Sequence, residues 1–157
     1  MRRIWPVVAV LVLGSCGVRP SGVTDAGRAP TGVAHGVTLY FVDAHERLRP
    51  QFRRTYRLGT VPEAVSLLLF GVGDSDLHTE IASVAGPRIL ATTGPGLIQL
   101  RVPLALREVT PLGIDQIVCT ALGVHVQSGG SRRTRVQVRF TLSTHESEKR
   151  RTCPLIR

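Results

Sequence analysis

The feature that most constrains this chain is a short apolar run that ends at a cysteine. Arg2 and Arg3 precede the run, which covers residues 4–13, and two small residues separate it from Cys16. A positive start, a short apolar stretch and small residues at its end are typical of a secretory signal peptide. The run is shorter than the roughly 20 residues that a permanent membrane-spanning helix needs. The folded part of the protein is therefore expected to follow Cys16 and to be exported.

The residues around Cys16 also indicate how the exported protein is held. Leu13-Gly14-Ser15-Cys16 resembles the lipobox of bacterial lipoproteins, with an aliphatic residue three places before the cysteine. This resemblance implies a signal peptide over 1–15, lipid such as palmitate on Cys16, and a position at the outer face of the cytoplasmic membrane. Several acyl chains make a durable anchor, since each buried CH₂ adds about 0.8 kcal/mol. An ordinary signal peptide that is cut elsewhere is the alternative.

Composition limits both the core and the partners. Hydrophobic residues make up 43% of the chain but aromatic residues only 4%, so the core must rest on aliphatic side chains. The formal net charge is +9, and a basic exported domain is attracted to anionic lipid headgroups or acidic wall polymers. No nucleic-acid partner is expected, because export and the few aromatic residues leave little for bases to stack on.

The three cysteines can be assigned under the lipoprotein interpretation. Cys16 carries the lipid, and Cys119 and Cys153 remain as an even pair in an oxidising compartment, which favours a disulfide. Closing a loop of about 35 residues would stabilise the fold by roughly 3–4 kcal/mol in the chain-entropy model. The alternatives are two buried free thiols, or a nucleophile formed by Cys119 with His125, for which no orienting third group is evident nearby.

The rest of the chain divides into a tether and one domain. Residues 16–36 contain mainly Gly, Pro, Ser, Thr, Ala and Val without a sustained period, and random-coil scaling gives them a reach of about 25 Å. Residues 37–157 are close to the common size of a single domain.

The domain is predicted to begin with a β-hairpin. Residues 37–42 are β-branched and aromatic, which favours a strand. A polar turn follows at 43–46, and residues 47–58 form the partner strand. Pro50 confines that partner to a sheet edge, because proline has no N–H to donate.

Two helices are predicted from the capping residues at their N-terminal ends. The helix over 62–71 follows Thr60, which can cap it, and the Glu three residues after Thr60 can complete a capping box. The second helix, over 111–122, follows the cap Thr110 and has a proline at its first position. Gly123 is expected to end it.

The remaining segments predict further strands. Residues 89–92 and 97–102 are predicted to form a hairpin around a tight turn at 93–96. Residues 135–142 alternate strictly between apolar and polar side chains. Val136, Val138, Phe140 and Leu142 are expected to face inward, and Arg135, Gln137, Arg139 and Thr141 outward. Other short strands are predicted at 81–84 and 124–127, a turn at 128–131, and a charged loop at 145–151. The fold class is therefore α+β, a mainly antiparallel sheet with two helices packed on one face.

The order of these segments resembles that of a known domain family. Six segments follow one another: the strand 37–42, the helix 62–71, Leu77-His78-Thr79-Glu80-Ile81, Leu97-Ile98-Gln99-Leu100, Gln116-Ile117-Val118-Cys119-Thr120 on the second helix, and the strand 124–126. Together they resemble the GerMN domain of bacterial sporulation and germination lipoproteins. Actinobacterial members look especially close, with a cysteine after Gln-Ile-Val and a Cys-Pro near the C-terminus, as at Cys153. The resemblance implies a non-enzymatic module, similar in fold to ring-building domains that self-associate or dock with envelope partners.

The most site-like cluster is a polar segment. Asp74, Asp76, His78 and Glu80 alternate with other residues, and such donors could hold a cation. An EF-hand loop would need a Gly at its sixth position and a Glu at its twelfth, and neither is present. Because the chain contains no familiar catalytic or cofactor motif, we expect no metal, no cofactor and no enzyme activity.

Arginines are the better candidates for function. The sequence predicts one arginine surface for an anionic partner, formed by Arg47, Arg49, Arg53, Arg54, Arg135 and Arg139. Charges on edge strands also prevent unwanted strand pairing, which is a sufficient role for some of them. The leading hypothesis is a lipid-anchored, non-catalytic envelope module that acts through a protein partner or a homo-oligomer. The alternatives are direct binding of wall polymer or lipid headgroups and, as the second, a metal-dependent hydrolase.

Overall fold

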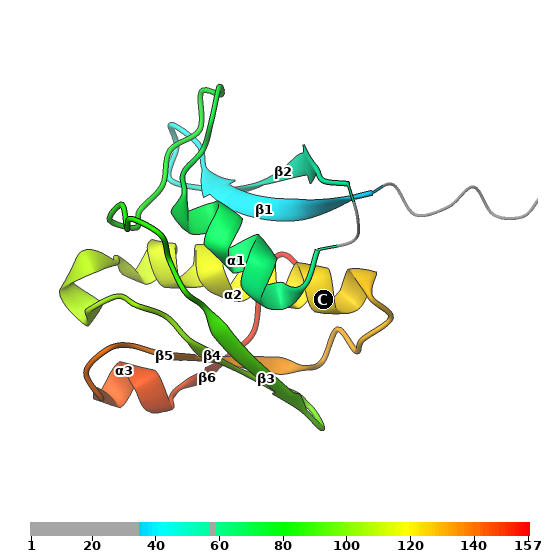
Figure 1. Ribbon diagram of the computed structural model, residues 1–157, viewed down its shortest axis with the longest axis vertical. Coiled ribbons are helices and arrows are strands. Elements are labelled where there is room, and N and C mark those ends of the chain that lie inside the picture. Colours follow the sequence, from blue (N-terminus) through cyan, green and yellow to red (C-terminus); the bar gives the residue numbers. More distant parts are fainter. Residues whose placement is uncertain (1–34, 57–58) are drawn as a thin grey trace, which may run out of the picture. The chain divides into compact units, whose positions relative to one another are not determined.

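A computed structural model describes residues 35–56 and 59–157 (Figure 1). The expected signal peptide at 1–15, the lipidation site Cys16 and nearly all of the tether at 16–36 lie outside these residues. Residues 35–56 and 59–157 form an α+β fold with mostly antiparallel strands and two main helices, which confirms the predicted class. The strands form two separate sheets, however, and not the single sheet that the sequence predicted.

The first sheet is the expected hairpin. Strand β1, Gly36–Val42, pairs antiparallel with β2, Leu48–Arg54. In the connecting turn the Asp43 side chain accepts hydrogen bonds from the backbone amides of His45 and Arg47, at 2.9 and 3.0 Å. These bonds organise the turn locally, as Asp side chains commonly do.

Helix α1, Val61–Leu69, begins as predicted. The Thr60 hydroxyl accepts from the amide of Glu63, and the Glu63 carboxylate accepts from the amide of Thr60 at 2.8 Å, which completes a capping box. The chain turns away at Gly71, whose φ of 105° is a conformation that glycine adopts without strain. The face of α1 that carries Val65 and Leu68 is fully buried.

The second sheet has the strand order β3-β4-β5-β6. Strands β3, Leu90–Gly94, and β4, Leu97–Arg101, form the predicted antiparallel hairpin. The pairing of β4 with β5, Arg135–Arg139, is parallel, because the chain crosses over through a helix between them. The short β6, Arg150–Arg151, pairs antiparallel with β5.

Helix α2, Pro111–Gln127, provides that crossover and is longer than the sequence predicted. The expected stop at Gly123 and the strand at 124–127 are both wrong. Gly123 packs against Tyr40, since a Cβ there would lie 3.4 Å from the Tyr40 ring, so this glycine permits close packing within the helix. Val124 continues the buried face, and burial decides the conformation of a short apolar run that periodicity leaves ambiguous.

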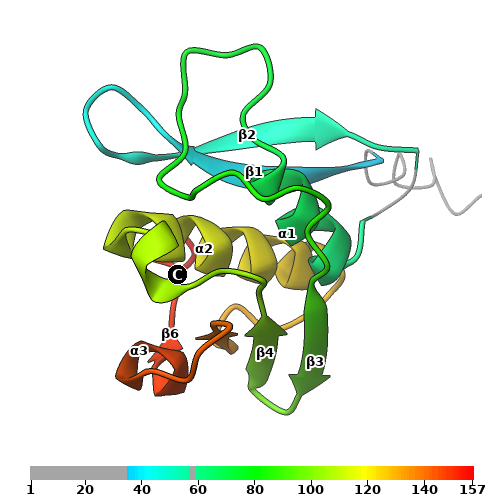
Figure 2. The ribbon, with the colours of Figure 1, turned by 60° about the vertical axis from the view of Figure 1, so that its left-hand side comes forward.

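The two helices lie between the two sheets (Figures 1 and 2). Helix α2 packs against β1 on one side and β5 on the other, and α1 packs against both α2 and β1. Residues 116–122 of α2 are accordingly buried without interruption, as expected for a helix covered on all sides. The inward residues of the second sheet, Ile98, Leu100, Val136 and Val138, complete the core.

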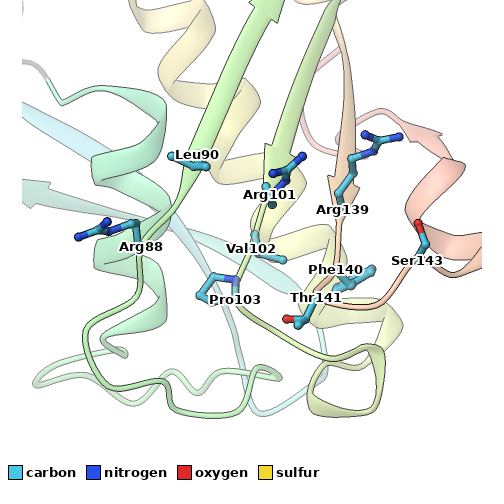
Figure 3. A pocket seen from close by; sticks show the side chains of 9 residues that line it. All are labelled: Arg88, Leu90, Arg101, Val102, Pro103, Arg139, Phe140, Thr141 and Ser143. Carbon is cyan, nitrogen blue, oxygen red and sulfur yellow. The ribbon is translucent and has the colours of Figure 1, made fainter.

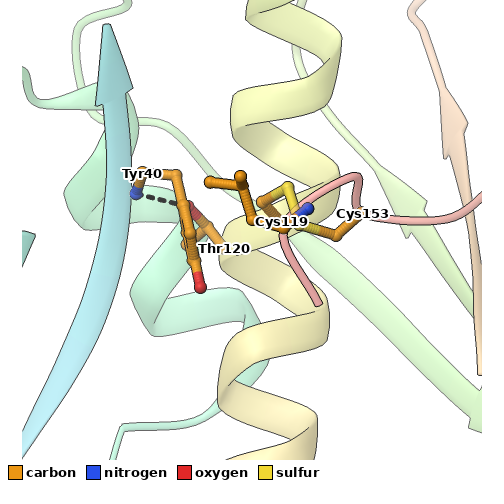
Figure 4. The surroundings of a disulfide bond; sticks show 5 residues. Tyr40, Cys119, Thr120 and Cys153 are labelled. Atoms are coloured by element: carbon orange, nitrogen blue, oxygen red, sulfur yellow. Dashed lines mark hydrogen bonds between the residues drawn. A yellow bond between two sulfur atoms is a disulfide. The ribbon is translucent and has the colours of Figure 1, made fainter. Parts of the chain in front are cut away.

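Polar side chains of α2 take the place of a neighbouring strand at the free edge of β1. Gln116 donates to the carbonyl of Tyr40 at 3.0 Å. The Thr120 hydroxyl accepts from the amide of Tyr40 at 3.1 Å (Figure 4). Gln127 donates to the carbonyl of Gly36 at 3.0 Å. Gln116 and Thr120 are fully buried, and such groups require partners. This satisfied edge explains why β1 and the second sheet remain separate.

The disulfide between Cys119 and Cys153 is present, as the sequence predicted (Figure 4). It links α2 to the segment after β6 across 34 positions of sequence. Both cysteines are buried in the same core as the helices. The bond therefore fastens the C-terminal end of the domain to its central helix.

Three further expectations need correction. Ile81 makes one isolated bridge to Val109, and residues 82–84 form no strand. Strand β5 ends at Arg139, and Leu142, which was expected to face inward, is 66% exposed. Gln137, which was expected to face outward, is only 4% exposed, and its side chain donates to the carbonyl of Ser147. That carbonyl belongs to the short helix α3, His145–Glu148, which with β6 replaces the predicted loop at 145–151. A short 3₁₀ turn, η1 at Leu106–Glu108, precedes α2.

Candidate interaction surfaces

Arg47 and Arg49 neutralise an acid of their own hairpin. The nearer ion pair joins Arg49 Nε to Asp43 Oδ2 at 2.8 Å, and Arg47 lies at 3.4 Å from the same oxygen. Partial burial acts to raise the pKa of Asp43, but the hydrogen bonds from Arg49, Arg47 and His45 outweigh it and hold that pKa well below its usual range. These two arginines therefore hold the turn together, and less of their charge is left for an external anion.

Arg53 is also engaged within the domain. Its guanidinium donates to the carbonyls of Gly71 and Val72, at 3.3 and 2.8 Å, and lies 5.9 Å from the centre of the Phe41 ring. These contacts hold the end of α1 against the hairpin, so Arg53 has a structural role. Arg54, the next residue along β2, is exposed.

Arg135 and Arg139 lie on the other sheet. Both are on β5, which the helices separate from β2 (Figures 1 and 2). The single arginine surface that the sequence predicted is therefore wrong: its members divide between two surfaces on opposite sides of the helical layer. The reason is that strand pairing across sheets depends on tertiary contacts, which the pattern of one strand does not contain.

A second group of arginines gathers at the end of the second sheet. Arg88, Arg101 and Arg139 line an open hollow of about 600 Å³ beside the ends of β4 and β5 (Figure 3). Arg88 and Arg101 were missed by sequence reasoning. The segment 97–102 was correctly predicted to be a strand, but nothing in its sequence indicates that Arg101 lies beside Arg139.

The polar segment at 74–80 forms a loop and one bridge. His78 exchanges backbone hydrogen bonds with Val42, and its Nε2 lies 3.3 Å from Glu80 Oε1. Asp74 and Asp76 are exposed. Within residues 35–56 and 59–157, no three His, Cys, Asp or Glu side chains are grouped so that they could hold a metal.

The alternative nucleophile pair is wrong, because the Cys119 sulfur is bonded to Cys153. His125 Nε2 lies 3.1 Å from Thr134 Oγ1, near the end of α2. The two residues that a Cys–His mechanism would need are thus in separate structural roles.

The outer edge of the second sheet is an exposed, uncharged strand. Over the part of the chain that the structure describes, β3 pairs only with β4. Its sequence, Leu-Ala-Thr-Thr-Gly, has no charged residue and no proline. Leu90 is 56% exposed, and Thr92, Thr93 and Gly94 are exposed with it. Edge strands of this kind can accept another strand.

The edge of β2 differs in chemistry. Pro50 lies opposite Tyr40, whose amide and carbonyl bond to α2, so this pair makes no ladder hydrogen bonds and the Pro50 nitrogen faces the outer edge. Pro50 therefore offers no N–H there, and the same strand carries Arg49 before it and Arg53 and Arg54 after it. Both features oppose strand addition.

Comparison with known families, with curated proteins and with solved structures gives no match. No helix among the described residues is long and apolar enough to cross a membrane.

Proposed function

We propose that this protein is a lipid-anchored, non-catalytic module of the cell envelope, which acts by pairing with another protein or with a second copy of itself. The proposal includes a relationship to GerMN domains and a role in sporulation, germination or another envelope process. The observation that carries it is the Cys119–Cys153 disulfide.

The disulfide supports export and lipidation because of the number of cysteines in the chain. The chain has three cysteines, and two of them are joined within the domain. A structural disulfide favours an oxidising compartment. Cys16, the remaining cysteine, follows Leu13-Gly14-Ser15 in the lipobox pattern, which favours a thioether-linked lipid there.

The edge of β3 supports the interaction. Two copies could pair β3 with β3 in antiparallel order around a two-fold axis, so that each edge is covered by the other and the assembly closes. Thr92 is the central residue of β3, and it would then face its counterpart across the axis. A partner strand from another envelope protein would use the same edge.

Lipidation is tested by labelling. Full-length protein expressed in a lipoprotein-processing bacterium is expected to incorporate labelled palmitate and to sediment with membranes, because acyl chains anchor it. The Cys16→Ser variant should lose the label and leave the membrane fraction. The Gly17→Ser variant, changed at the next position, serves as the control and should behave as the wild type. Wild-type protein without label would contradict the proposal.

Strand pairing is tested by adding one charge at the edge. Thr92→Lys is expected to abolish a cross-linked dimer or partner complex, because a lysine on an edge strand opposes pairing and two would meet across the axis. Thr152→Lys adds the same charge at another exposed position and should leave the complex intact. Equal cross-linking in both variants, with unchanged melting temperatures, would exclude the β3 edge.

A further inference from the structure

The hollow at the end of the second sheet combines an apolar floor with a basic rim. Val102 and Phe140 line it and are themselves almost fully buried. Its volume of about 600 Å³ is within the range of small-molecule sites. Arg101 and Arg139, which line it, belong to β4 and β5. These strands lie on the opposite side of the helices from β1 and β2, so the hollow is independent of the hairpin arginines (Figure 1).

Arg101 and Arg139 are direct neighbours across the sheet. They are register partners in the parallel pairing of β4 with β5, and their side chains extend the same way from adjacent strands (Figure 3). Paired strands lie about 4.8 Å apart, so two positive charges are held close together. Such a like-charge pair is unfavourable without a counter-ion.

The domain supplies little negative charge to this pair. Glu148 Oε1 lies 3.7 Å from an Arg139 nitrogen, and both side chains are largely exposed, at 60% and 43%. An exposed pair of this kind contributes about 0–1 kcal/mol. Within the described ranges Arg101 makes no ion pair, and no carboxylate lines the hollow.

The donors that line the hollow suit a tetrahedral oxyanion. Each guanidinium presents a planar fork of N–H groups that can bind two oxygens at once. The hydroxyls of Thr141 and Ser143 belong to the same lining, and both residues are exposed (Figure 3). A phosphate has enough oxygens to accept from both forks, whereas a carboxylate has only two. Arg88 lies across the hollow with its guanidinium directed away from it (Figure 3), so the phosphate site is assigned to Arg101 and Arg139.

We propose that this hollow binds a phosphate group carried by a small polyol, with the phosphate between Arg101 and Arg139. The carrier can be a free polyol phosphate or the headgroup of a glycerophospholipid, since both present the same chemistry. The apolar floor beside the arginines would contact the carbon skeleton of the carrier. This site does not depend on lipidation of Cys16 or on pairing at β3.

The test uses the full-length protein and two probes at low ionic strength. Titration with glycerol 3-phosphate, followed by calorimetry, measures the free source. Flotation with phosphatidylglycerol vesicles, compared with phosphatidylcholine vesicles, measures the headgroup source. In at least one arm, Arg101→Gln with Arg139→Gln is expected to weaken binding by about tenfold or more, since a hydrogen bond to a charged group is worth about that factor.

A charge-matched variant separates the hollow from general basicity. Arg132→Gln with Arg133→Gln removes two charges from exposed positions outside the hollow and should bind within about twofold of the wild type, because their fields are screened beyond roughly 10 Å. All variants keep the same N-terminal residues, so differences between them in flotation do not come from the anchor. Melting temperatures verify that each variant is folded.

Each result has one meaning. Selective loss with glycerol 3-phosphate supports a free ligand, and selective loss with vesicles supports a headgroup. No phosphate-dependent binding in either arm, or equal loss in both double variants, overturns the proposal. Glycerate that binds as tightly as glycerol 3-phosphate would also overturn it, because the site would then not distinguish phosphate from carboxylate.

Discussion

Gln116→Leu is expected to lower the free energy of unfolding by about 2–5 kcal/mol, although the replacement is apolar and similar in size. The Gln116 side chain donates to the carbonyl of Tyr40, and its Oε1 accepts from the amide of Glu80 at 2.8 Å. Leucine would leave both backbone groups without a partner. A buried group without a partner costs about 1–3 kcal/mol, and the Glu80 amide costs less than the Tyr40 carbonyl because it is only partly buried. Urea unfolding of the oxidised protein measures the change.

Gln127→Leu is the matched control for this prediction. Gln127 makes the same kind of bond, to the carbonyl of Gly36, but it is only partly buried and lies at the end of α2. Water can replace its bond, so the expected loss is about 0.5–1.5 kcal/mol. If both variants lost equal stability, the buried edge of β1 would not have the importance that the geometry gives it.

Removing the disulfide is expected to have a similarly large effect. With Cys119→Ala and Cys153→Ala together, the unfolded chain regains the freedom of a loop that spans 34 positions. The chain-entropy model gives a loss of about 3–4 kcal/mol. Wild-type protein in reductant should approach the variant in stability, and the measurement is again urea unfolding, with and without reductant.

The variant itself supplies the control, because its unfolding should not respond to reductant. A single Cys153→Ala change should be nearly as destabilising as the double change, since either one opens the bond. A wild-type protein whose unfolding midpoint is the same with and without reductant would contradict this assignment.

Local signals predicted the parts of the fold that local chemistry decides. The capping box of Thr60 and Glu63 and the hairpin turn at Asp43 depend on residues within a few positions of each other. The β3–β4 hairpin has the same local character. The disulfide could also be predicted, because two cysteines remain once Cys16 is assigned to lipid.

Long-range packing determined the parts of the fold that local patterns predicted wrongly. The sequence pattern predicted a strand at residues 124–127, but these residues continue α2, because Val124 is buried on the helix face that meets the core. The alternation of residues 135–142 predicted that Gln137 faces outward, but α3 covers it and the Ser147 carbonyl accepts its hydrogen bond. In each case the deciding contact comes from another part of the chain, which a single-sequence pattern does not reveal.

The candidate site followed the same division. Three of the arginines chosen from the hairpin bond within the domain: Arg47 and Arg49 bond to Asp43, and Arg53 bonds to the carbonyls of Gly71 and Val72. Arg101 is identified as a neighbour of Arg139 only by the parallel register of β4 and β5. Charge can be read from composition, whereas the juxtaposition of two charges requires the strand order.

The helical layer shared by the two sheets has a consequence for dissecting this domain. Residues 35–56 alone would lack both helices and expose Val37, Leu39 and Phe41. The four-stranded sheet would expose the side of α2 that now meets β1. A truncation that keeps only one sheet therefore leaves an apolar surface uncovered, and such fragments aggregate readily. The module must be transplanted, fused or expressed whole.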